Sequence, residues 1–146
     1  MKSLVLLAGL AAATFAIDAA AQAKPEDLIK QRKSAYAIMG YNMGSLGAMA
    51  QEKKPFNKDE AAANAQMIVA VAGYPKGFFA PGTDTGDTKA KPEIWKNKAD
   101  FDAKMDKMLA AVKALPGATG DLAALKKAVG DVGGTCKACH DDYRAK

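Results

Sequence analysis

Both cysteines and the only histidine of this 146-residue chain stand together near its C-terminus, in the sequence Cys136-Lys137-Ala138-Cys139-His140. A C-x-x-C-H pattern is typical of covalent attachment of a c-type haem. Residues three and four apart share a helix face, so both sulfurs can add to the two vinyl groups along one haem edge. The ring of His140 lies on the same face and can reach the iron as an axial ligand. The sequence therefore predicts a haem held by Cys136 and Cys139.

The cysteine pair has three other interpretations. A redox-active dithiol usually stands at a helix N-terminus, where the dipole lowers the thiol pKa. This pair comes late in a helical pattern, where the dipole opposes thiolate formation. A structural zinc site usually needs four protein ligands, and the chain has no fourth Cys or His. An ordinary disulfide is the third alternative.

The first residues have the pattern of a secretory signal peptide rather than of a spanning helix. Lys2 supplies the positive charge, and an apolar stretch follows from Leu4 to Ile17. Small residues then offer cleavage sites after Ala21 or Ala23. We expect residues 1–23 to be removed and residues 24–146 to form one exported domain, in a bacterium in the periplasm and without a membrane anchor.

The remaining length suits a single domain with one core. The formal net charge is +5, but no run of basic residues with interleaved aromatics is present, so nucleic-acid binding is not expected. The lysines instead fit the solvated faces of amphipathic helices.

Helical periodicity predicts four helices. The first is expected from about Glu26 to about Gln51 and the second from the N-cap Asn57 to Gly73. A long irregular stretch follows, from Tyr74 to Lys91, and stretches of this length are usually functional or flexible. The third helix should end at residues 115–117, and the fourth should begin at the cap Asp121 and carry the cysteine motif. The pattern predicts an all-α fold, an antiparallel four-helix bundle.

The motif fixes only one axial ligand, and a second would have to come from upstream. Methionine is the obvious candidate, although most methionines simply fill core space. Six follow the signal peptide: Met39, Met43, Met49, Met67, Met105 and Met108.

A series of short motifs in order resembles the cytochrome c prime family, the class II c-type cytochromes, over essentially the whole mature chain. The motifs are Lys24-Pro25-Glu26-Asp27, Arg32-Lys33-Ser34-Ala35, Pro81-Gly82-Thr83, Pro92-Glu93-Ile94-Trp95, Gly130-Asp131-Val132-Gly133-Gly134 and Cys136-Lys137-Ala138-Cys139-His140-Asp141-Asp142-Tyr143-Arg144.

The resemblance implies one covalently bound haem c per chain inside the bundle, with His140 as the sole protein ligand. The face of the haem opposite His140 is expected to be covered by Tyr36. Low-spin relatives carry a methionine in or near that turn. Arg32 matches the family arginine near the haem propionates, and Arg144 matches an arginine beside the proximal face. Weaker candidates for contacts at the haem periphery are Lys33 and Asp87.

The resemblance also implies electron transfer and reversible binding of NO and CO at a five-coordinate, high-spin iron. The alternative is a six-coordinate electron carrier with Met39 or Met43 on the iron. A peroxidase is not expected, because the chain has no second histidine for peroxide cleavage. A homodimer through the first two helices is expected, and Gly40, Gly44 and Gly47 are compatible with it. The redox partner cannot be named from the sequence.

Overall fold

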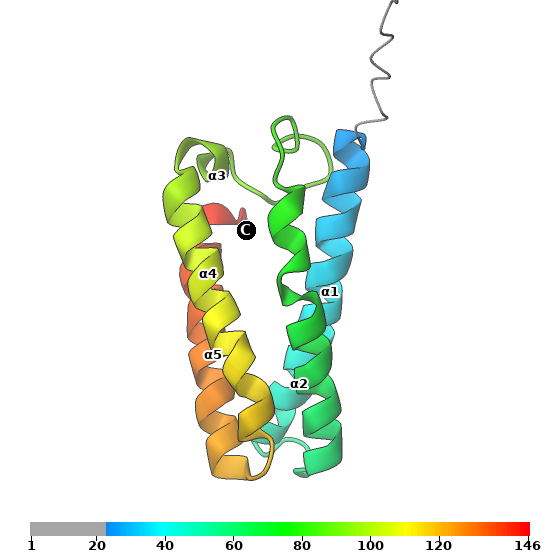
Figure 1. The fold of residues 1–146 in the computed structure, drawn as a ribbon, viewed down its shortest axis with the longest axis vertical. Coiled ribbons are helices and arrows are strands. Elements are labelled where there is room, and N and C mark those ends of the chain that lie inside the picture. Colours follow the sequence, from blue (N-terminus) through cyan, green and yellow to red (C-terminus); the bar gives the residue numbers. More distant parts are fainter. Residues whose placement is uncertain (1–22) are drawn as a thin grey trace, which may run out of the picture.

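The computed structural model describes residues 23–146, so the expected signal peptide lies outside the described residues except for Ala23. Four long helices run antiparallel to their neighbours in the chain and form one bundle (Figure 1), which confirms the predicted all-α four-helix bundle. They are α1 (Pro25–Ala50), α2 (Lys58–Ala72), α4 (Lys98–Ala114) and α5 (Leu122–Tyr143). The connections hold a one-turn helix, α3 (Glu93–Lys96), and two 3-10 segments, Tyr74–Phe78 and Leu115–Ala118.

The helix starts follow local chemistry. Pro25 occupies the first turn of α1, where its missing N–H is no loss. The side chain of Asn57 accepts a hydrogen bond from the Glu60 amide at 2.9 Å and caps α2. Asp121 caps α5 by accepting from the amides of Ala123 and Ala124 at 2.8 and 2.9 Å. Such caps satisfy N–H groups that have no partner inside the helix.

The core extends along the bundle, and most of its completely buried side chains lie in the half where α1 ends and α2 begins. There the apolar stripes of all four long helices meet. Burying each large aliphatic side chain contributes about 1.5–3 kcal/mol relative to leaving it in water. Side chains in this region with no exposed surface include Leu46, Met49, Ala61, Ala65, Ile68, Leu115 and Leu125. The opposite half, where α1 begins and α5 ends, is therefore the one with room for a site.

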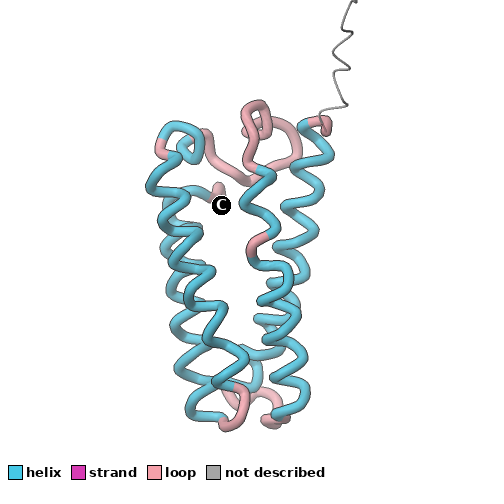
Figure 2. Tube along the Cα trace, viewed as in Figure 1, coloured by secondary structure: helices cyan, strands magenta, loops and turns pink. Residues whose placement is uncertain are grey.

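Residues 73–92, between α2 and α3, form the long connection, which lies over this second half of the bundle (Figure 2). Trp95 holds its start, since the indole N–H donates to the carbonyls of Phe79 and Ala80 at 3.1 and 3.0 Å. The end of the connection, residues 89–91, pairs with residues 143–145, which are the last residue of α5 and the two residues after it. The amide of residue 91 donates to the carbonyl of residue 143 at 3.0 Å, and the amide of residue 145 to the carbonyl of residue 89 at 2.8 Å. The C-terminus thus lies at the same end of the bundle as the start of α1.

Within residues 23–146 we find no helix that combines the length and the apolar character required to span a membrane.

Candidate haem site

A cavity of about 650 Å³ lies between α1, α4, α5 and the long connection, and we call it the central cavity. Its volume is within the range of about 300–1,000 Å³ that is usual for small-molecule and cofactor sites. The structure brings all eight predicted site residues to its wall: Arg32, Lys33, Tyr36, Asp87, Cys136, Cys139, His140 and Arg144. The size of the cavity and this donor set fit a covalently attached haem.

The helix α5 presents Cys136, Cys139 and His140 to the central cavity from adjacent turns, as expected for residues three and four apart. Burial raises the pKa of both thiols, so they are neutral rather than activated as a redox dithiol would be. Burial, and next the positive charge of Arg144, lower the pKa of His140. The imidazole is therefore neutral at neutral pH, the form that can bind a metal ion.

Tyr36 reaches the same cavity from α1 and meets Met105 of α4. Its hydroxyl donates a hydrogen bond to the sulfur of Met105, with an oxygen-to-sulfur distance of 3.6 Å. Burial raises the pKa of Tyr36 well above its usual value, so the phenol stays neutral. The side chain is therefore a bulky, uncharged group whose position is fixed across the cavity between two helices.

Arg32 is not a surface charge, because only 2% of its area is exposed. Its guanidinium makes four hydrogen bonds to the long connection. Nη1 donates to the Phe78 carbonyl at 3.1 Å and to Oγ1 of Thr83 at 2.7 Å. Nη2 donates to the Thr83 carbonyl and to Oγ1 of Thr88, both at 2.6 Å. Of the five guanidinium N–H groups only the one on Nε is left over, and contact of Arg32 with a haem propionate stays a prediction.

Three predicted residues lie at the rim of the central cavity. The ammonium group of Lys33 on α1 binds the carboxylate of Asp87 at 2.5 Å and the carbonyl of the same residue at 3.2 Å. Arg144 follows the last residue of α5 and forms an isolated antiparallel bridge with Ala90. Their predicted contacts with the edge and proximal face of a haem stay predictions.

Sequence reasoning missed Lys104 as a cavity residue. It comes from α4, lines the central cavity, and binds Asp142 at 3.0 Å and Asp100 at 3.8 Å. Its ammonium group thereby ties the end of α5 to α4. The only signal in the sequence was its place beside Met105 at the edge of the apolar stripe. Methionines also line the cavity, including both candidates for a second iron ligand: Met39, Met43, Met105 and Met108.

Comparison with known proteins gives a consistent result. The family described as Cytochrome C′ matches residues 27–144. A cytochrome c′ from Rubrivivax gelatinosus is 44% identical over 126 residues, which cover 84% of this chain and 98% of that protein. The crystal structure of cytochrome c′ from the same organism superposes with a TM-score of 0.80 at 43% identity, covering 84% of this chain and 98% of that one.

A second solved structure is the ferrous form of a variant of cytochrome c prime from Alcaligenes xylosoxidans with bound NO. Its TM-score is 0.78 at 37% identity, and the match covers 85% of this chain and 98% of that chain. Matches of this identity and coverage confirm the resemblance seen in the sequence. The chain therefore belongs to the cytochrome c′ family, and its cofactor is covalently bound haem c.

Proposed function

We propose that the protein is a periplasmic haem protein with five-coordinate, high-spin iron, which carries electrons and reversibly binds NO and CO. The observation that carries the proposal is the position of Tyr36, a neutral phenol in the central cavity whose hydroxyl is bound to Met105. When bound, the haem supplies a redox-active iron with one coordination position open to a small ligand.

In this proposal Cys136 and Cys139 hold the cofactor through thioether bonds, and the neutral ring of His140 is the only protein ligand of the iron. The placement of all three side chains on one face of α5 supports these roles. Burial and the positive charge of Arg144 lower the pKa of His140, so the ring stays neutral, and the positive charge withdraws electron density from the ring nitrogen that would bind the iron. A modest bond between His140 and the iron follows from this.

Tyr36 closes the other face and selects ligands by size. A ligand must displace the ring, which costs the hydrogen bond to Met105 and some packing. The surroundings are largely apolar, because Met39, Met108 and Val132 line the same cavity. NO and CO need less polar stabilisation than bound O₂, so such a pocket favours them. The solved structure of the relative from Alcaligenes xylosoxidans contains bound NO, and this property of the relative supports NO as a ligand here.

The alternative is a six-coordinate electron carrier with Met39 or Met43 on the iron. Both methionine side chains line the central cavity. Spectroscopy of the iron distinguishes the five-coordinate from the six-coordinate form. Electron paramagnetic resonance of the resting ferric protein should give a high-spin signal, and the ferrous form should take up NO and CO reversibly. A low-spin signal together with a far-red charge-transfer band from a bond between methionine sulfur and iron would establish the alternative.

We propose ligand binding and electron transfer rather than catalysis. The only histidine of the chain, His140, is assigned to the iron, which leaves no second histidine to cleave peroxide. Peroxide turnover by the purified haem protein should stay close to that of free haem. A much higher rate would contradict this part of the proposal.

We also propose that residues 1–23 form a signal peptide, cleaved after Ala21 or Ala23, and that the mature domain of residues 24–146 works in the periplasm. The charged start, the apolar stretch and the small residues of the sequence support this. N-terminal sequencing of the protein released by osmotic shock should begin at residue 22 or 24. Recovery of the intact N-terminus in the cytoplasm would contradict it.

A homodimer through α1 and α2 is part of the same proposal. All large apolar side chains that are strongly exposed in the described residues belong to α1, α2 or the turn after α2: Ile38, Tyr41, Met67, Val69 and Tyr74. Tyr41 has 80% of its surface exposed. Sedimentation should show a dimer that Tyr41→Glu weakens, whereas Lys113→Glu on α4 should leave it intact.

A further inference from the structure

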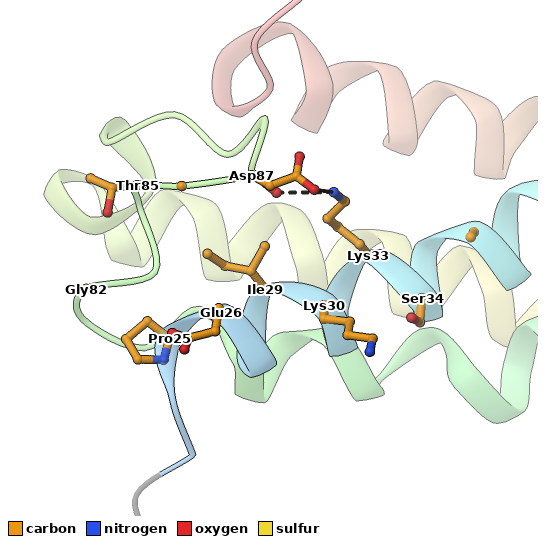
Figure 3. A pocket seen from close by; sticks show the side chains of 11 residues that line it. Pro25, Glu26, Ile29, Lys30, Lys33, Ser34, Gly82, Thr85 and Asp87 are labelled. Carbon is orange, nitrogen blue, oxygen red and sulfur yellow. Dashed lines mark hydrogen bonds and ion pairs between the residues drawn. The ribbon is translucent and has the colours of Figure 1, made fainter.

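A second hollow, of about 780 Å³, lies beside the central cavity and we call it the side groove. It runs between the first turns of α1 and the part of the long connection around residues 82–87 (Figure 3). Glu26 and Lys30 line it from α1, and Gly82 and Thr85 line it from the connection. These four residues are exposed, so the groove belongs to the surface.

The side groove and the central cavity share a wall of three residues, Lys33, Ala37 and Asp87, each of which lines both hollows. Ala37 contributes only a methyl group. The gap between α1 and the connection is bridged here by the ion pair of Lys33 and Asp87, which Figure 3 shows as a dashed contact. The side chains of the pair are 50% and 95% exposed. A solvent-exposed ion pair contributes little to stability and is screened by salt, so this contact is easily broken.

The rest of the connection does not need to move when the pair opens. The segment 84–87 is bounded by Thr83 and Thr88, and the buried guanidinium of Arg32 holds both. Gly86, at the tip, has φ of +87°, a conformation that favours glycine, so the tight shape of the segment is built into the sequence. Opening is therefore confined to a short stretch fastened at both ends.

The shared wall adjoins the face of the central cavity that we assign to gas ligands. Ala37 directly follows Tyr36, and Lys33 precedes it by one helical turn. We propose that the ion pair of Lys33 and Asp87 is the gate of a path from the side groove to the Tyr36 side of the central cavity, through which NO and CO enter and leave. This inference rests on the proposed gas binding.

The test measures ligand passage by flash photolysis of the ferrous CO complex, in a Tyr36→Ala background so that displacement of the tyrosine does not limit the rate. Asp87→Asn should raise the CO association rate and the escaping fraction, by up to about fivefold for the loss of one exposed ion pair. Lys33→Met should do the same. The effects of the two substitutions should not add fully in the double variant, because both remove the same ion pair, while Lys33→Met also removes the hydrogen bond from the ammonium group to the Asp87 carbonyl at 3.2 Å.

Two further measurements distinguish a gate formed by the ion pair from independent effects of Lys33 and Asp87. High salt should speed CO association in the background protein and leave the Asp87→Asn variant unchanged. Ala37→Phe, which fills the shared wall, should slow both entry and escape. The matched control is Lys76→Met, which breaks another exposed ion pair, that of Lys76 with Asp106 at 2.6 Å. This variant should change neither the entry rate nor the escape rate of CO.

The outcomes distinguish the inference from the function on which it rests. If the ferrous protein binds no CO at all, the proposed gas binding fails and the gate fails with it. If CO binds but Asp87→Asn and Ala37→Phe leave both rates unchanged, gas binding stands and the path lies elsewhere. Full additivity of Lys33→Met and Asp87→Asn would also overturn the gate.

Discussion

Arg32 donates two hydrogen bonds to one residue, Thr83, from Nη1 to Oγ1 at 2.7 Å and from Nη2 to the backbone carbonyl at 2.6 Å. Thr83 is itself fully buried, and its hydroxyl also donates to the Ala80 carbonyl at 2.8 Å. The guanidinium lies over the Phe79 ring, 4.7 Å from its centroid. One side chain on α1 thus organises the segment that covers the open end of the bundle.

Replacing Arg32 should loosen this segment. Arg32→Gln leaves the buried acceptors of Thr83 and the half-buried hydroxyl of Thr88 without their donor, so we expect a loss of at least about 2 kcal/mol in the free energy of unfolding. Arg32→Lys should recover little, because one ammonium group cannot reproduce the planar fork of donors. Urea unfolding and limited proteolysis at residues 84–87 measure the effect. Lys30→Gln, on an exposed position of the same helix, is the control, and equal stability of both variants would contradict the role of Arg32.

Tyr36→Met places a sulfur ligand where the phenol now closes the cavity. We expect the ferric protein to shift from high spin toward low spin in its resonance and absorption spectra. Tyr36→Phe keeps the bulk without a ligand atom and should stay high-spin. If Tyr36→Met leaves the spectrum unchanged, Tyr36 does not lie over the iron.

The sulfur of Met105 accepts the hydrogen bond that fixes the Tyr36 hydroxyl. Met105→Leu keeps a similar volume but removes the acceptor, so the tyrosine ring should move aside more easily. Thioether sulfur is a weak acceptor, and we expect CO to associate with the ferrous protein up to about threefold faster. Met108→Leu is the matched control, since Met108 lines the same cavity. A rate equal to that of the control would show that Met105 does not hold Tyr36.

Tyr143 donates a hydrogen bond to the carboxylate of Asp100 at 2.6 Å, which is the main cause that raises the pKa of Tyr143 to about 12. The usual pKa of tyrosine is about 10, so the folded state holds this proton more tightly than the unfolded chain. The contribution to stability is present in full below about pH 10 and is lost as pH rises through about 12.

Asp100→Asn removes the negative charge, so Tyr143 should titrate nearer to pH 10 and alkaline unfolding should begin earlier. Tyrosinate absorbance followed against pH checks this, with Tyr143→Phe identifying the contribution of that ring. Asp102→Asn on the same helix is the control. An unshifted titration of Tyr143 in Asp100→Asn would show that the carboxylate is not the cause.

The helices were predictable because their signals are local. Asn57 and Asp121 cap α2 and α5 as their sequence positions suggest, and the spacing of Cys136, Cys139 and His140 already places them on one face. The expected boundaries of the first two helices differ from the observed ones by only about a residue. Hydrogen bonding between neighbours in the chain and helical periodicity decide such features.

The wall of the site was less predictable because its contacts join distant parts of the chain. The acceptors of Arg32 on Thr83 and Thr88 lie 51 and 56 residues away. Met105 is 69 residues from Tyr36 in the chain, and the ion pair of Lys104 and Asp142 joins α4 to α5. No local pattern distinguishes these threonines or this lysine from ordinary polar residues. The family resemblance identified Arg32 and Tyr36, but only the packing shows which neighbours hold them.

The pairing of residues 89–91 with residues 143–145 has a consequence for the order of folding. The two segments lie far apart in the chain, so the long connection acquires these partners only once α5 has packed against the rest of the bundle. The cysteine motif comes just before residues 143–145. The wall of the central cavity is therefore completed by the same packing step that brings the attachment residues of the cofactor into place.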